Sequence, residues 1–148
     1  MTDISTSISG DPLDIAATIG AATTPESGGL GVFVGTVRSG TVRSGTADDR
    51  TVIRLEYEAH PTLADEALGA IARQAAAKWD LHRVIAIHRT GSCEVGEPTV
   101  VVVCSAAHRA EALDACRWMI DEIKTMVPIW KREVYSDGSS WVGGEGPH

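Results

Sequence analysis

The run TVVVVCSAA, residues 99–107, decides how the rest of the chain must be arranged. Its four consecutive valines, residues 100–103, would present apolar side chains to both faces of a strand. Such a strand is typical of the centre of a sheet that is covered on both sides. The run therefore predicts a central strand with other elements packed above and below it.

The segment that follows, from about His108 to Met126, has the pattern of an amphipathic helix. Its apolar residues recur three or four positions apart, at Leu113, Cys116, Ile120, Ile123 and Val127. Pro128 ends this helix, because a proline disfavours helical backbone in the residue before it. The sequence beyond predicts a hairpin, with strands at 129–135 and 140–142 and a turn at 136–138.

The upstream sequence predicts one more long helix and three more strands. The helix runs from Pro61 to about Trp79, where apolar residues again lie three or four apart. The strands are LGVFVGTV at 30–37, TVIRLEYEA at 51–59 and LHRVIAIHRTG at 81–91, with a turn at SCEVGEP after the last. We expect the first two to form a hairpin with a long connection, and the whole chain to form one α+β domain, residues 1–148.

Three segments lack the pattern of a packed element. Residues 1–10 and 143–148 are expected to be flexible tails, and 38–50, which contains most of an imperfect TVRSG duplication, a mobile loop. A short helix is expected in DPLDIAATIGA, with Asp11 as its N-cap and Pro12 at its first position.

Composition narrows the classes of function. The chain is 43% hydrophobic and carries a formal net charge of -7, which argues against a general nucleic-acid binder and against binding to an acidic membrane. No apolar run approaches the roughly 20 residues of a spanning helix, and the N-terminus lacks the pattern of a secretory signal, so a cytoplasmic location is expected. Three cysteines without a CxxC pair predict neither a disulfide framework nor a zinc site.

Two lysines on either side of a proline are the first candidates for chemistry. The bend at Pro128 lets Lys124, on the last helical turn, and Lys131, on the next strand, converge on one hollow, where they would attract an anion and lower each other's pKa. Strand alternation sends Lys131 and Arg132 to opposite faces, so at most one of them shares that hollow. Two simpler roles stay open, which are stabilisation of the helix dipole by Lys124 and solubility for both lysines.

Other cations are separated from this pair. His108 and Arg109 begin the same helix, where free N–H groups favour an anion, although His108 could equally be a plain helix-start residue. At about 1.5 Å per residue, His108 lies roughly 24 Å from Lys124, so one small ligand can touch both only in a site built from two subunits. Arg38, at the end of a predicted strand, could close over a ligand or simply be solvated.

Several motifs, taken together, resemble the large, catalytic subunit of molybdopterin synthase, the MoaE family. The matching segments span about residues 30–142 in order: FVGTVR (33–38), LEYEAH (55–60), AIHRTGSCEVGE (86–97), SAAHRAEALDA (105–115), DEIKTMVPIWKRE (121–133) and DGSSWV (137–142).

The resemblance implies a hammerhead-like α+β domain with an antiparallel or mixed sheet and two main helices. It also implies a sulfurtransferase of molybdenum cofactor biosynthesis. A small ubiquitin-like carrier subunit would deliver sulfur on its C-terminal thiocarboxylate to cyclic pyranopterin monophosphate, giving the molybdopterin dithiolene. The subunit would be a homodimer at the centre of a heterotetramer, and it would need no metal and no bound cofactor.

The same resemblance suggests roles for individual residues. Lys124 and Lys131 correspond to catalytic lysines. The other residues correspond to substrate-binding positions: Phe33, Thr36, Val37 and Arg38 in the first motif, His108 and Arg109 from the other protomer, and Arg132 and Glu133 after Lys131. Arg43 in the duplicated TVRSG is a less suitable match than Arg38, which alone has the spacing from Phe33. A non-catalytic dimer that binds a phosphopterin or another anion, or an assembly subunit, remains the alternative.

Overall fold

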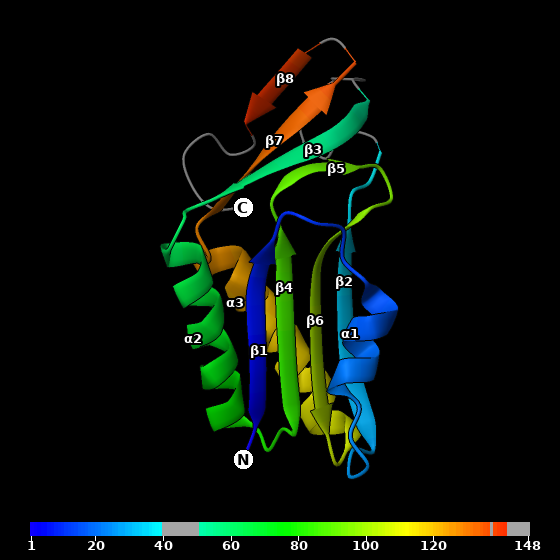
Figure 1. Ribbon diagram of the computed structural model, residues 1–148, viewed down its shortest axis with the longest axis vertical. Helices are drawn as coiled ribbons and strands as arrows, with labels where there is room; N and C mark the ends of the chain where they lie inside the picture. Colours follow the sequence, from blue (N-terminus) through cyan, green and yellow to red (C-terminus); the bar gives the residue numbers. More distant parts are fainter. Residues whose placement is uncertain (40–50, 137, 142–148) are drawn as a thin grey trace.

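The computed structural model describes residues 1–39, 51–136 and 138–141, and over these residues the chain forms two sheets and three helices (Figure 1). The elements in order are β1 (Asp3–Ser9), α1 (Ile15–Ala22), β2 (Gly29–Thr36), β3 (Val52–Ala59), α2 (Leu63–Lys78), β4 (Arg83–Arg89), β5 (Gly91–Glu94), β6 (Pro98–Ala106), α3 (Arg109–Met126), β7 (Ile129–Tyr135) and β8 (Gly138–Trp141).

The first sheet, called sheet A, has the strand order β1-β4-β6-β2. β1 runs parallel to β4, whereas β6 is antiparallel to both of its neighbours. As the four valines predicted, β6 is an inner strand, and it is buried from Thr99 to Ala106. Its side chains divide between the two faces, with Val100 and Val102 in the main core and Val101 and Val103 in a smaller one.

Helices cover both faces of sheet A. The long helices α2 and α3 pack on one face, α2 over β1 and α3 over β2 and β6, while the short helix α1 lies on the other (Figure 1). The main core lies under α2 and α3, where Leu68, Met119 and Ile123 are among the largest fully buried side chains. The smaller core lies under α1.

The second sheet, sheet B, has the antiparallel order β5-β3-β7-β8 and lies across one end of sheet A (Figure 1). Short connections tie it there, two of them of one or two residues. β4 passes into β5 through Thr90, and α3 passes into β7 through Val127 and Pro128. The head formed by sheet B on the longer body of sheet A agrees with the predicted hammerhead-like α+β fold.

Helix α3 lies very close to β2 because β2 carries glycine where the two touch. A Cβ atom added to Gly31 would lie 2.2 Å from the carbonyl oxygen of Ala112, and one added to Gly28, just before β2, would lie 2.2 Å from that of Ala107, just before α3. No side chain fits in these spaces, so the glycines set the position of the first turns of α3 against sheet A.

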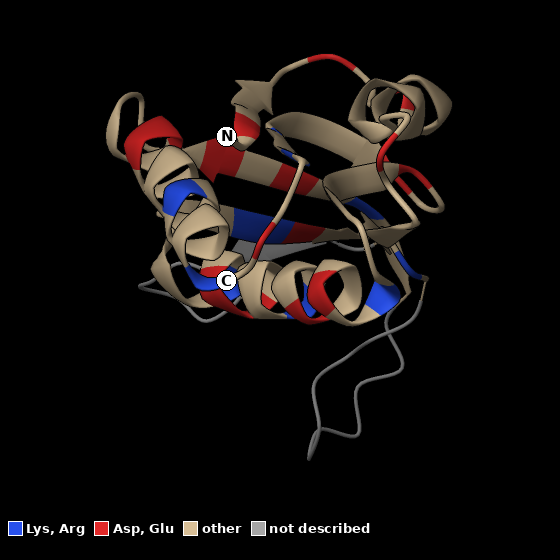
Figure 2. Cartoon of the chain, turned by 90° about the horizontal axis from the view of Figure 1, so that it is seen from below, with Lys and Arg blue, Asp and Glu red and all other residues tan. Residues whose placement is uncertain are grey.

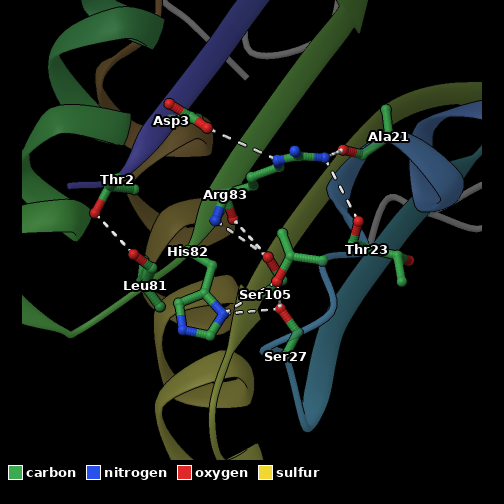
Figure 3. A network of polar contacts seen from close by, with 10 residues as sticks. Thr2, Asp3, Ala21, Thr23, Ser27, Leu81, His82, Arg83 and Ser105 are labelled. Carbon is green, nitrogen blue, oxygen red and sulfur yellow. Dashed lines mark hydrogen bonds and ion pairs between the residues drawn. The ribbon is translucent and has the colours of Figure 1, made fainter.

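The N-terminal prediction was wrong. Residues 1–10 were expected to be a loose tail, but Asp3–Ser9 form the parallel edge strand β1. Polar contacts at the base of sheet A hold this region (Figure 3). Thr2 donates to the carbonyl of Leu81, and Arg83 reaches both the Asp3 carboxylate and the carbonyl of Ala21 at the end of α1.

The same network anchors the connection between α1 and β2. The hydroxyl of Ser27 lies 2.8 Å from Nδ1 of His82, and Ser105 bonds the backbone of Arg83 (Figure 3). The N-cap of α1 is Asp14, whose side chain accepts from the N–H of Ala17, and not Asp11 as expected.

Three further expectations need correction. Strands 30–37 and 51–59 are not a hairpin, because β2 pairs with β6 in sheet A and β3 with β5 and β7 in sheet B. Leu113, expected on the buried stripe of α3, is 54% exposed. The segment expected only as a turn after β4 contains strand β5. Residues 40–50 of the predicted loop and the tail 143–148 lie outside the described residues.

In the part of the chain that the structure describes, no helix is both long enough and apolar enough to cross a membrane.

Gly31→Ala should destabilise the protein by about 1–3 kcal/mol, because the new methyl group must push the backbone of α3 away from β2. Urea unfolding monitored by circular dichroism would measure the change. Gly20→Ala is the matched control, since a Cβ there meets nothing within 4 Å and the residue lies in helix α1. It should stabilise by up to about 1 kcal/mol. Equal effects of the two substitutions would contradict the close approach.

Candidate active site

A pocket lies where the two sheets meet the C-terminal end of α3. Its lining comes from the end of β2, from β3, from Thr99 on β6, from Lys124 on α3 and from β7. The side chains that can carry charge in it are Arg38, Lys124, Lys131 and Glu133, together with the phenol of Tyr57. Counted over the described residues, three cations and one carboxylate make this pocket positive in a chain whose net charge is negative.

The backbone brings the two lysines together as the bend at Pro128 predicted. Lys124 is on the last turn of α3, and β7 begins at Ile129 directly after the proline. The carbonyl of Pro128 accepts a hydrogen bond from the N–H of His60, which ties the bend to the end of β3. Lys131 then stands opposite Tyr57 across the β3–β7 ladder.

Both lysines have a lowered pKa. For Lys124 the larger cause is desolvation by surrounding protein, and the second is the positive charge of Lys131. For Lys131 desolvation again comes first. The carboxylate of Glu133 opposes it, and the charge of Arg38 adds to it. Each ammonium group is therefore easier to deprotonate than a lysine in water, which makes either lysine better suited to proton transfer.

Alternation along β7 separates Lys131 and Glu133 from Arg132, as the sequence predicted. Arg132 pairs with the carboxylate of Glu56 directly across the ladder, and this arginine is the largest cause of the lowered pKa of Glu56. Arg132 and Glu56 line a different hollow of sheet B with Glu58, Gly91 and Ser92. The structure therefore does not bring Arg132, a predicted substrate-binding residue, to the lysine pocket.

The predicted FVGTVR residues divide between the pocket and the core. Thr36 and Arg38 line the pocket. The side chain of Val37 is 2% exposed and belongs to the main core, so its contribution to the site is its backbone. Phe33 packs against the same core beside Gly35, where an added Cβ would meet the phenyl ring at 3.4 Å.

His108 and Arg109 lie at the other end of α3. His108 is the N-cap residue and makes no side-chain cap bond, and α3 continues unbroken to Met126. Neither residue is among those lining the lysine pocket. A separation of roughly 24 Å along one straight helix follows from the rise per residue, so a single chain does not unite the two groups.

Sequence reasoning missed Tyr57 and Thr99. Burial raises the pKa of Tyr57 to about 12, against the opposite effect of a hydrogen bond with Thr99, so this phenol keeps its proton at neutral pH. Its ring also lies edge-on to His88, with centroids 5.1 Å apart. Alternation could predict that Tyr57 faces inward, but the pairing that sets it beside Lys131 joins strands over 70 residues apart.

The cysteines supply no reactive group to this site. All three are buried, and burial raises the pKa of each thiol. The pKa of Cys104 rises to about 12 and that of Cys116 to about 11. Among the described residues no cluster of three or more His, Cys, Asp or Glu side chains could hold a metal ion. Carboxylates and cations are mixed along the two long helices (Figure 2), so these helices do not present a surface of one sign.

Comparisons with known proteins show the same family that the sequence motifs resemble. A family model described as "MoaE protein" matches residues 8–126. The chain is 39% identical over 132 residues to the molybdopterin synthase catalytic subunit of Arabidopsis thaliana, covering 89% of this chain and 64% of that protein. It is 41% identical over 132 residues to molybdopterin synthase catalytic subunit 1 of Mycobacterium tuberculosis, covering 89% and 86%. It thus spans less than two thirds of the plant relative's length.

A solved structure gives the same result for the fold. The crystal structure of molybdopterin synthase from Staphylococcus aureus superimposes with a TM-score of 0.82 at 30% identity, covering 92% of this chain and 95% of that one.

Replacing Lys131 by alanine should raise the pKa of Lys124, because a neighbouring positive charge and part of the surrounding protein are removed together. NMR titration of the Lys124 side chain in labelled protein would measure the change. Lys78→Ala, on α2, is the control and should leave the titration of Lys124 where it is. An unchanged Lys124 in Lys131→Ala would mean that the two ammonium groups do not interact.

The native protein should react with a thiol reagent such as DTNB at pH 8 at least about 100-fold more slowly than the unfolded chain, because all three thiols are buried and protonated. The unfolded chain in guanidinium should titrate three thiols. One native cysteine that reacts as fast as free cysteine would contradict the burial of the thiols.

Proposed function

The chain belongs to the MoaE family, and from that premise we propose that it is the catalytic subunit of a molybdopterin synthase. In this proposal it moves sulfur from the C-terminal thiocarboxylate of a small ubiquitin-like carrier subunit onto cyclic pyranopterin monophosphate, in molybdenum cofactor biosynthesis. The reaction takes place in the cytoplasm and uses no metal or bound cofactor of this subunit.

The observation that carries the proposal is the convergence of Lys124, Lys131 and Arg38 in one partly desolvated pocket. Both proposed reactants are anions, one ending in a thiocarboxylate and the other carrying a phosphate. Cations in a site of reduced water content bind such groups more strongly than they would at the surface.

The lowered pKa values favour catalysis over plain anion binding. An anion-binding lysine needs to stay charged, whereas the surroundings of these two lysines lower their pKa and so favour the neutral amine. We propose that one ammonium group holds the thiocarboxylate while a neutral lysine accepts or returns a proton as sulfur moves. The sulfur bonds to the pterin, its bond to the carrier's carbonyl carbon breaks, and water takes its place on that carbon, which leaves the carrier with a carboxylate. The guanidinium of Arg38 would bind the anionic substrate, and Thr36 and Glu133 would contact it from the same walls.

The remaining predicted residues fit the proposal as contributions of a second copy. His108 and Arg109 are exposed at the start of α3. In a symmetric dimer each pocket would combine Lys124 and Lys131 of one chain with His108 and Arg109 of the other, and a carrier subunit at each end would complete a heterotetramer. Arg132 is assigned no contact with the substrate, because it pairs with Glu56 outside the pocket.

Lys124→Ala and Lys131→Ala should each lower formation of the dithiolene product by at least about 100-fold, because each removes a group proposed to move a proton or hold the anion. The assay mixes the protein with a thiocarboxylated carrier and cyclic pyranopterin monophosphate. Binding of the carrier, measured by calorimetry, should persist. Lys78→Ala, which removes an exposed lysine of α2, is the control and should retain full product formation.

The same assay distinguishes the alternatives. A non-catalytic anion-binding dimer would give no product with the unmodified protein, although the pterin would bind. An assembly subunit would bind the carrier and be indifferent to both lysine substitutions.

A further inference from the structure

A buried arginine outside the pocket has no role in the chemistry proposed above. Arg89 ends β4, in the corner where the chain leaves sheet A for sheet B, and it is 4% exposed. Its guanidinium pairs with the carboxylate of Glu97 and donates to the carbonyl oxygens of Ser92 at 3.2 Å and Gly10 at 3.4 Å. A charge this deeply buried is costly unless it is paired, so its position requires the carboxylate of Glu97.

The carboxylate of Glu97 also closes a turn. Its Oε1 atom accepts the N–H of Glu94 at 3.0 Å, and the N–H of Glu97 donates to the carbonyl of Glu94 at 2.9 Å. Between them Gly96 has a φ of +88°, a backbone conformation that other residues rarely adopt. Residues 94–97 thus form one tight unit, fixed to Arg89 through a single carboxylate.

This turn is hydrogen-bonded to the segment that follows β2 and leads to the pocket. The N–H of Val37 donates to the carbonyl of Glu97 at 3.1 Å, and the N–H of Gly96 donates to the carbonyl of Val37 at 2.7 Å. The ladder between β2 and β6 becomes irregular just before this point, between Gly35 and Thr36. Beyond this irregularity the turn, and not the sheet, holds the backbone at Val37. The residues on either side of it, Thr36 and Arg38, both line the pocket.

We propose that the Arg89–Glu97 ion pair is a positioning device for the pocket, which closes the 94–97 turn so that the turn holds Val37 and keeps Arg38 beside Lys131. Neither member of the pair lines the pocket, so both act through the backbone of Val37. The positioning stands on the geometry alone, and only its consequence for turnover rests on the proposed function.

The titration of Lys131 reports the position of Arg38. The charge of Arg38 is one cause of the lowered pKa of Lys131, so a displaced Arg38 lets that pKa rise. A direct electrostatic effect of losing the Glu97 carboxylate has the opposite sign, because removing a negative charge makes any ammonium group easier to deprotonate. The direction of the change therefore separates positioning from simple loss of charge.

The experiment measures the Lys131 pKa by side-chain NMR titration in the full chain, in four single variants and in one double variant. Glu97→Gln keeps the shape of the side chain without its charge, and Glu97→Ala removes the whole link. Arg38→Ala gives the effect of losing the arginine outright. Val103→Ala, in the smaller core under α1, is a control for a loss of stability away from the pocket.

We expect the Lys131 pKa to rise in both Glu97 variants and in Arg38→Ala, and to stay at its original value in Val103→Ala. Adding Glu97→Ala to Arg38→Ala should give no further rise, because the arginine to be positioned is already absent. An unchanged or lowered Lys131 pKa in the folded Glu97 variants would overturn the proposal. So would loss of the fold in both, since the pair would then support the whole domain and not this segment.

A second readout depends on turnover. If the proposed reaction is confirmed, Glu97→Gln should lower product formation and move the pH dependence of activity upward, in step with Lys131. Failure of the sulfur transfer itself would leave the NMR result intact, so the two proposals can fail independently.

Discussion

Burial of β6 on both faces is the constraint on which the rest of the structure depends. A strand with apolar side chains on both sides is stable only if both faces of its sheet are covered, and α3 with α2 on one side and α1 on the other provide that cover. The glycines of β2 then let α3 lie directly against the sheet. Because the course of α3 is fixed in this way, its last turn, with Lys124, must emerge beneath sheet B.

The pocket obtains its positive charge from position and not from composition. The chain has more carboxylates than cations. Near the site, however, few carboxylates are described, and one of them is paired with arginines. Glu56 is bound by Arg132 and Arg54 on the other face of sheet B, and among the described carboxylates only that of Glu133 lines the pocket. Partial desolvation then makes each remaining charge more effective, since neighbouring charges interact more strongly where water is reduced.

Local patterns predicted the parts of the fold that depend on near neighbours. They gave β6, α3, the bend at Pro128 and the opposite faces of Lys131 and Arg132, because each follows from a period of 2.0 or 3.6 or from one proline. They missed the partners of β2 and β3, since pairing is decided by distant strands. They also missed β1, whose Ser and Thr residues carry no apolar signal. They placed Leu113 on the buried face of α3, but the face that packs closely against β2 leaves this residue exposed.

Helix α3 fixes the distance between the cations at its two ends, which limits how one chain could carry out the proposed reaction. With 18 residues in one unbroken helix, His108 and Lys124 are held at opposite ends, and no loop movement within one chain brings them together. If both serve one substrate, each chain carries two half-sites, and twofold symmetry completes both at once. Association and activity would then be coupled: a substitution that separates the two copies should abolish turnover even where every residue of the lysine pocket is intact.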